Sequence, residues 1–141
     1  MEIREGEPRG EELSRRFEGV LSLLRFLRRC GRLSEVDKFA SAPDADSAVE
    51  ILREAMSLVY RSRRGAYCVD EEIDADDVGK YEYLCGRVCV ERRDGRYFLR
   101  VRCPRLPTAE ELEALYGELK SGGLKPSVLA ALALARGGRG P

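Results

Sequence analysis

The middle of the chain reads Arg87-Val-Cys-Val-Glu-Arg-Arg-Asp-Gly-Arg-Tyr-Phe-Leu-Arg-Val-Arg102, and this stretch decides the fold. Apolar and polar residues alternate on both sides of an Asp94-Gly95 pair. Asp-Gly between alternating segments is typical of a two-residue type I′ turn, because both central residues of that turn need positive φ. We therefore predict a β-hairpin, with one strand within residues 83–93 and the other at residues 96–103.

The register that this turn imposes gives the hairpin two faces. One face is apolar and is expected to join the core: Val88, Val90, Leu99 and Val101. The opposite face gathers positive charge and one aromatic ring: Arg87, Arg100, Arg102 and Phe98. Because like charges directly across a strand pair repel, Arg87 facing Arg102 requires a compensating anion.

Two sources of that anion are open. Residues 70–77 hold six acids and are predicted to form an exposed loop, which could fold over the hairpin. Residues 65–82 carry seven acids and one base, whereas residues 83–105 carry seven bases and two acids, so the two segments could nearly cancel. The other source is a nucleic acid, with arginines neutralising phosphates and Phe98, Tyr97 or Tyr83 offering a ring for a base.

Helical spacing of apolar residues predicts three helices before the hairpin. The first covers residues 11–30. Ser34 is expected to cap a short second helix, and Asp44 or Asp46 to cap a longer third helix that ends near Gly65. The outward positions of the first helix carry five arginines, which are further candidate contacts for nucleic acid: Arg15, Arg16, Arg25, Arg28 and Arg29.

Two more helices are predicted after the hairpin. Thr108 and Glu111 form a capping box, Gly122 ends that helix, and Pro126 suits the first turn of the last one. The predicted fold class is α+β: a mainly α-helical domain with a small β-hairpin or antiparallel β-subdomain inserted before the last two helices. We predict a flexible leader at residues 1–10 and a helical domain in two parts, 11–64 and 106–136. A small β-subdomain at residues 65–105 lies between these parts, and residues 137–141 form a flexible tail.

Composition excludes much chemistry. The 141 residues suffice for one ordinary domain, and they include no His, Asn, Gln or Trp. The commonest general base and the side-chain amides that read adenine are therefore missing, and no glycine-rich phosphate loop precedes a helix. We expect no catalytic residue, no metal and no cofactor.

Few thermolabile side chains and abundant charge, at 35% of residues, are typical of proteins from thermophiles. No apolar run is long enough to span a bilayer, and we expect a soluble, cytoplasmic protein without membrane contact.

The five cysteines match no common zinc spacing. A disulfide is more plausible, for example between Cys68 and either Cys85 or Cys89, and the sequence leaves open which of these three and Cys103 are joined. Buried, inert thiols are expected for Cys30 and Cys103.

One part of the chain resembles a known family. Arg29-Cys-Gly-Arg-Leu-Ser-Glu-Val-Asp-Lys-Phe-Ala40, the break at Pro43, and Ala48-Val-Glu-Ile-Leu-Arg-Glu-Ala-Met-Ser-Leu-Val-Tyr60 resemble the small subunit of archaeal type I-A CRISPR interference (Cascade) complexes. The resemblance implies a non-catalytic scaffold in antiviral defence. Its partners would be other subunits of a ribonucleoprotein complex, further copies of itself, and, weakly, target DNA or the displaced single strand. The alternative is a protein-binding or self-associating regulatory module with no nucleic-acid contact.

Overall fold

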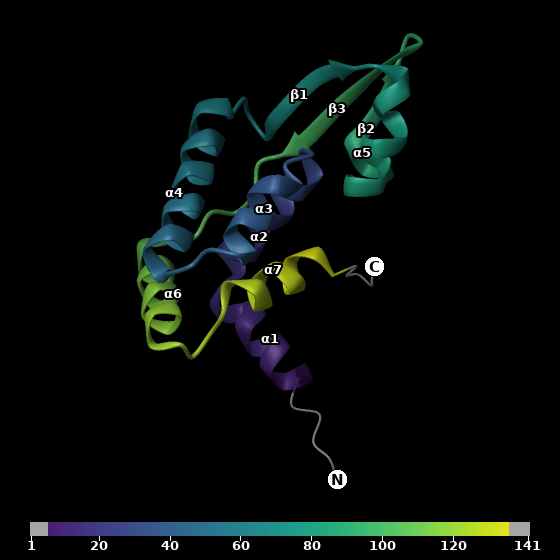
Figure 1. The fold of residues 1–141 in the computed structure, drawn as a ribbon. Helices are drawn as coiled ribbons and strands as arrows, with labels where there is room; N and C mark the ends of the chain where they lie inside the picture. The colour runs from purple at the N-terminus through teal and green to yellow at the C-terminus, as the bar shows by residue number, and fades with distance from the viewer. Residues whose placement is uncertain (1–5, 136–141) are drawn as a thin grey trace.

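The computed structural model describes residues 6–135. Within that range seven α-helices and one three-stranded antiparallel sheet make a mainly helical α+β fold, as predicted (Figure 1). Residues 6–10 of the predicted leader belong to the first helix. The first five residues of the leader and the predicted tail at 137–141 lie outside the described range.

The helix predicted over residues 11–30 is two helices, α1 (Gly6–Arg16) and α2 (Glu18–Arg29). The chain departs from helical geometry at Phe17, with φ −122° and ψ 41°. A partner distant in the sequence satisfies the backbone at the break: the carboxylate of Glu111 accepts a hydrogen bond of 2.9 Å from the N–H of Val20. Apolar spacing continues through the break, so the pattern could not reveal it.

The next two helices are α3 (Leu33–Ala40) and α4 (Ala45–Ser62). The predicted cap at Ser34 is wrong, because Ser34 lies inside α3. Asp44 caps α4 as predicted: its Oδ1 accepts a hydrogen bond of 2.8 Å from the N–H of Ser47. Hydrogen bonding from Ser47 lowers the pKa of Asp44, as expected where a carboxylate accepts from the first turn of a helix.

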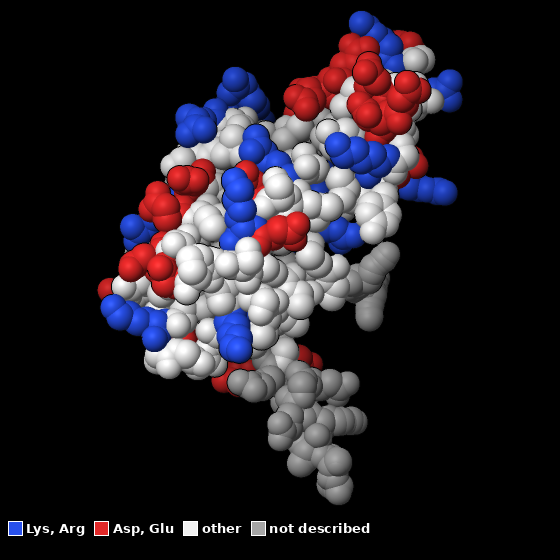
Figure 2. Space-filling model, in the orientation of Figure 1, with Lys and Arg blue, Asp and Glu red and all other residues white. Residues whose placement is uncertain are grey.

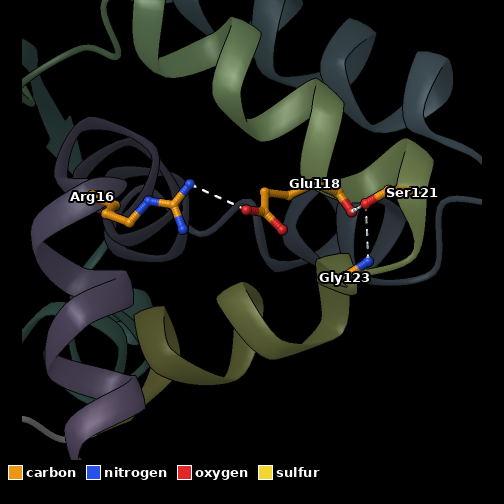
Figure 3. A network of polar contacts seen from close by, with 4 residues as sticks. All are labelled: Arg16, Glu118, Ser121 and Gly123. Atoms are coloured by element: carbon orange, nitrogen blue, oxygen red, sulfur yellow. Dashed lines mark hydrogen bonds and ion pairs between the residues drawn. The ribbon is translucent and has the colours of Figure 1, made fainter.

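After the sheet come α6 (Ala109–Ser121) and α7 (Pro126–Leu134). Half of the predicted capping box is present: Thr108 Oγ1 accepts from the N–H of Glu111 at 3.0 Å, whereas the Glu111 side chain reaches α2 instead. Gly122 ends α6 in the left-handed region, with φ 84°. Figure 3 shows how the end of α6 is held, with Arg16 of α1 paired to Glu118 at 3.2 Å and Ser121 accepting from the N–H of Gly123 at 3.3 Å.

The sheet consists of β1 (Tyr67–Ile73), β2 (Val90–Arg93) and β3 (Arg96–Arg102), in the order β1-β3-β2. The Asp-Gly turn is confirmed, since both residues have positive φ, 53° at Asp94 and 77° at Gly95. The predicted register is confirmed from the 93/96 pair to the 90/99 pair.

Beyond Val90 the predicted hairpin is wrong. Residues 78–85 form helix α5 (Val78–Cys85), and Arg87–Cys89 is a 3₁₀ turn, so Arg87 does not face Arg102. Of the residues predicted as an acidic loop, 70–73 form the second part of β1 and Ala75–Asp77 form a 3₁₀ turn, and β1 pairs with β3 on the edge away from β2. Val88, expected in the core, is 88% exposed. The hairpin partner β2 pairs with β3 only as far as Leu99. The second half of β3 therefore pairs with β1 alone.

The structure joins Cys68 to Cys103, with Cα atoms 4.8 Å apart, and Cys85 to Cys89. The expected free thiol at Cys103 and the example pairings of Cys68 are therefore wrong. Cys68 lies where β1 gains one residue relative to β3, between the 67/102 and 69/101 pairs, and this irregularity brings it to the end of β3. Cys30 is free, and burial raises the pKa of its thiol to about 12.

The core is built around α2, whose Val20, Leu23 and Leu24 have no exposed surface. Leu99 and Val101 of β3 belong to the same buried cluster, so the small sheet shares the core of the helices. Gly19 permits the close approach of the chain before α6: a Cβ there would lie 2.6 Å from the Cα of Pro107. Among the helices of residues 6–135, none has the length and apolar character needed to cross a membrane.

Candidate nucleic-acid interface

Three of the predicted arginines face one pocket. Arg25, Arg28 and Arg29 of α2 form one side of a cavity of about 550 Å³. Residues 82–86 at the end of α5 form another side, and Ala133 and Ala135 at the end of α7 complete it. Figure 1 shows α5 and the C-terminal end of α7 on the right of the molecule. Arg25, Arg28 and Arg29 lie on one face of α2, because residues three and four apart in a helix share a face.

The lining of this pocket carries more positive than negative charge. Glu82 is the one carboxylate among the residues that line it. No ion pair within residues 10–135 involves Arg25, Arg28 or Arg29. Burial and, next, the charge of Arg29 lower the pKa of Arg25. A phosphate in this pocket would relieve the repulsion that the arginines exert on one another.

Arg100 of the hairpin, unlike the arginines of the pocket, has carboxylate partners. Its guanidinium contacts Glu91 at 3.2 Å and Asp70 at 3.4 Å, and lies 4.2 Å from the centre of the Tyr67 ring. The hydrogen bond to Glu91 and, after the opposing effect of burial, the charge of Asp70 raise the pKa of Arg100. Arg96 pairs with Glu72 at 3.3 Å. Neutralisation of the hairpin by the acidic segment 70–77 is thus confirmed for these two arginines, through a strand rather than a loop.

The other hairpin candidates are dispersed. Phe98 is half-buried and lies under Arg93, whose guanidinium carbon is 4.5 Å from the ring centre. Arg102 is exposed at the end of β3, beside Tyr67 of the neighbouring strand. Arg87 is exposed in the turn after α5. These side chains therefore do not form the single arginine face that the hairpin register predicted.

Two candidates from the first predicted helix lie on α1, apart from the pocket. Arg16 pairs with Glu118 of α6 and lies 4.9 Å from the centre of the Phe17 ring, so it fastens α1 to the helical core. Arg15 is exposed. The break at Phe17 separates both residues from the helix that carries Arg25, Arg28 and Arg29.

The sequence prediction missed α5, which supplies Tyr83 to the pocket. The sequence predicts a strand at Tyr83 and offers its ring for a base. A helical signal was present: Val78, Tyr81 and Leu84 recur at spacings of three, and Gly86 follows as a stop. In the structure Leu84 is buried and Tyr81 packs beside Gly31, where a Cβ would lie 3.2 Å from the ring.

Acidic side chains gather elsewhere. A groove of about 640 Å³ between α4 and α6 is lined by four carboxylates, those of Asp46, Glu50, Glu110 and Glu113, together with Arg53. Figure 2 shows another acidic cluster over β1 and the start of α5, where residues 70–77 lie. Carboxylates therefore outnumber basic side chains in the groove between α4 and α6, whereas arginines outnumber them in the pocket between α2 and α5.

No protein-family model matches the chain, and a search of curated proteins finds no match. Within residues 6–135, the structure gathers no group of three or more side chains of the types that hold a metal ion.

Proposed function

We propose that this protein is a non-catalytic small subunit of a crRNA-guided CRISPR interference complex of the Cascade type. It would pack on other protein subunits and further copies of itself, and help to hold target DNA or the displaced single strand. The observation that supports its nucleic-acid role is the pocket between α2 and α5, where Arg25, Arg28 and Arg29 line one cavity and make no ion pair within residues 10–135.

The physical basis is counterion release. Each arginine that neutralises a phosphate displaces a condensed cation from the strand, which makes binding favourable and dependent on salt. Arg100 and Arg96 have carboxylate partners already, so their contribution to such binding is smaller than their place on the hairpin suggested. The layout also agrees with the resemblance, since the small sheet is inserted before the last two helices.

The test is binding of a fluorescently labelled oligothymidylate by the full chain, measured by anisotropy between 50 and 200 mM salt. Three phosphate contacts give a slope of about −2 in log affinity against log salt, which is a loss of roughly 20-fold over this range. The double variant Arg28→Gln/Arg29→Gln should reduce the slope by about 1.4. Its matched control is Arg53→Gln/Arg63→Gln on and just after α4, where both side chains are exposed.

The acidic groove between α4 and α6 favours a second candidate, a protein-binding or self-associating module without nucleic-acid contact. Its four carboxylates suit a basic partner surface rather than a phosphate. Absence of oligonucleotide binding at every salt concentration, together with salt-sensitive association of the chain with itself, would favour this candidate over the nucleic-acid role.

A further inference from the structure

Tyr83 adds an aromatic ring to the pocket between α2 and α5. It lines the cavity beside the three arginines, and its side chain is 77% exposed. The other residues of the cavity include the apolar side chains of Leu84, Ala133 and Ala135. The site therefore combines cationic groups, an available aromatic face and apolar surface in one hollow, which is the set of groups that contacts phosphate and base together.

The element that carries Tyr83 is fixed on α2. Tyr81, two residues earlier, packs beside Gly31 just after α2, and Leu84, the next residue, is 5% exposed. The final residue of α5, Cys85, is joined to Cys89 before β2. The ring of Tyr83 is thus presented by a helix anchored on both sides of it, so binding need not order the whole segment.

A duplex could not use this site in the same way. Its bases are stacked on both faces and paired, so a tyrosine ring reaches a base face only where a base has left the stack. The cavity of about 550 Å³ lies within the range of pockets that hold small molecules, and one nucleotide is a ligand of that class.

We propose that the pocket between α2 and α5 binds one unstacked nucleotide of a single strand, with the base on Tyr83 and the neighbouring phosphates on Arg25, Arg28 and Arg29. This inference rests on the proposed function and specifies its site. It makes the pocket selective for single strands over duplexes and indifferent to base identity, because every base has a face that can stack.

The experiment compares Tyr83→Ala, Tyr83→Phe and the control Tyr60→Ala, which removes another exposed tyrosine, on α4. Binding of the full-length variants to a labelled oligothymidylate, to the same strand with abasic positions, and to a duplex is measured by anisotropy. Tyr83→Ala should weaken binding to the intact strand by about 5- to 150-fold, the equivalent of losing one stacked base. Tyr83→Phe and Tyr60→Ala should stay near the parent protein.

The abasic strand identifies the mechanism. The parent protein should prefer the intact strand to the abasic one, and Tyr83→Ala should bind both equally. Salt-dependent binding that is unchanged by Tyr83→Ala overturns the stacking site while the proposed nucleic-acid role survives. Binding to no strand at any salt concentration overturns both. Circular dichroism spectra should be the same for every variant, because Tyr83 and Tyr60 are exposed.

Discussion

The carboxylate of Glu111 accepts a hydrogen bond from the backbone N–H of Val20, 2.9 Å away and 91 residues earlier in the chain. Val20 lies in the first turn of α2, where the break at Phe17 leaves the helix without a local side-chain cap. Glu111 thus caps α2 from another helix, and its negative charge lies at the helix end that favours anions. The contact fastens α6 to the central helix of the core.

Glu111→Ala should lower the free energy of unfolding by about 1–3 kcal/mol, because a partly buried donor loses its partner. Glu111→Gln should cost less, since the amide oxygen can still accept. Chemical denaturation with circular dichroism measures both. Glu113→Ala is the control, as that side chain is exposed on the same helix. Equal stability of Glu111→Ala and Glu113→Ala would show that the cap is unimportant.

Gly19→Ala should destabilise the fold, although alanine is the better helix former. The added Cβ would meet backbone atoms of Leu106 and Pro107 at 2.6–2.7 Å, and backbone cannot move aside as a flexible side chain can. We expect a loss of about 1–3 kcal/mol from overpacking. Gly117→Ala in α6, with no atoms near its added Cβ, should instead gain roughly 0.5–1 kcal/mol. Thermal unfolding of the two variants should therefore shift in opposite directions.

The Cys68–Cys103 bridge closes a loop with a sequence separation of 35 residues. Loop closure in the unfolded chain makes such a bridge worth roughly 3–4 kcal/mol, and the Cys85–Cys89 bridge less, because its loop is far shorter. Cys68→Ser/Cys103→Ser should therefore lower the melting temperature more than Cys85→Ser/Cys89→Ser. Peptide mapping without reduction checks the pairing itself. A reversed order of the two melting shifts would contradict the loop-size argument.

Cys30 should resist alkylation in the folded protein. Burial raises the pKa of its thiol from 9.0 to about 12, so at pH 8 the reactive thiolate is about 1,000-fold scarcer than in the unfolded chain. As pH rises, the Cys30 thiol loses its proton in the unfolded chain before it does so in the folded protein. The contribution of Cys30 to the free energy of unfolding therefore falls between about pH 9 and about pH 12. Iodoacetamide labelling with and without denaturant, followed by mass spectrometry, measures the protection. Equal rates in both conditions would contradict it.

Arg100→Ala should lower the melting temperature, because Asp70 on β1 and Glu91 on β2 would lose the cation that lies between them on β3. Arg87→Ala should leave melting unchanged, since Arg87 is exposed and makes no ion pair within residues 10–135. The difference between the two variants should shrink at high salt, where exposed charges are screened. A melting loss in Arg87→Ala equal to that in Arg100→Ala would contradict this assignment.

The features that sequence reasoning placed correctly depend on neighbours within a few residues. The Asp94-Gly95 turn, the Asp44 cap and the Thr108 cap each need only the residues beside them. The arginines of the pocket were also named from the helical repeat alone. The repeat could not show that Arg25, Arg28 and Arg29 line the same cavity as Tyr83, because residues 83–85 at the end of helix α5 were predicted as part of a strand.

The sequence by itself determined the element types over most of the chain, the position of the hairpin turn and a zero net charge. Tertiary structure decided which arginines keep their charge available. Pairing of β1 with β3 brings Asp70 to Arg100 and Glu72 to Arg96, while α5 brings Tyr83 to Arg25, Arg28 and Arg29 without comparable neutralisation among the described residues. The physical reason is range: turns and caps are set by local backbone geometry, whereas a charge is compensated by whatever carboxylate the fold places within a few ångströms.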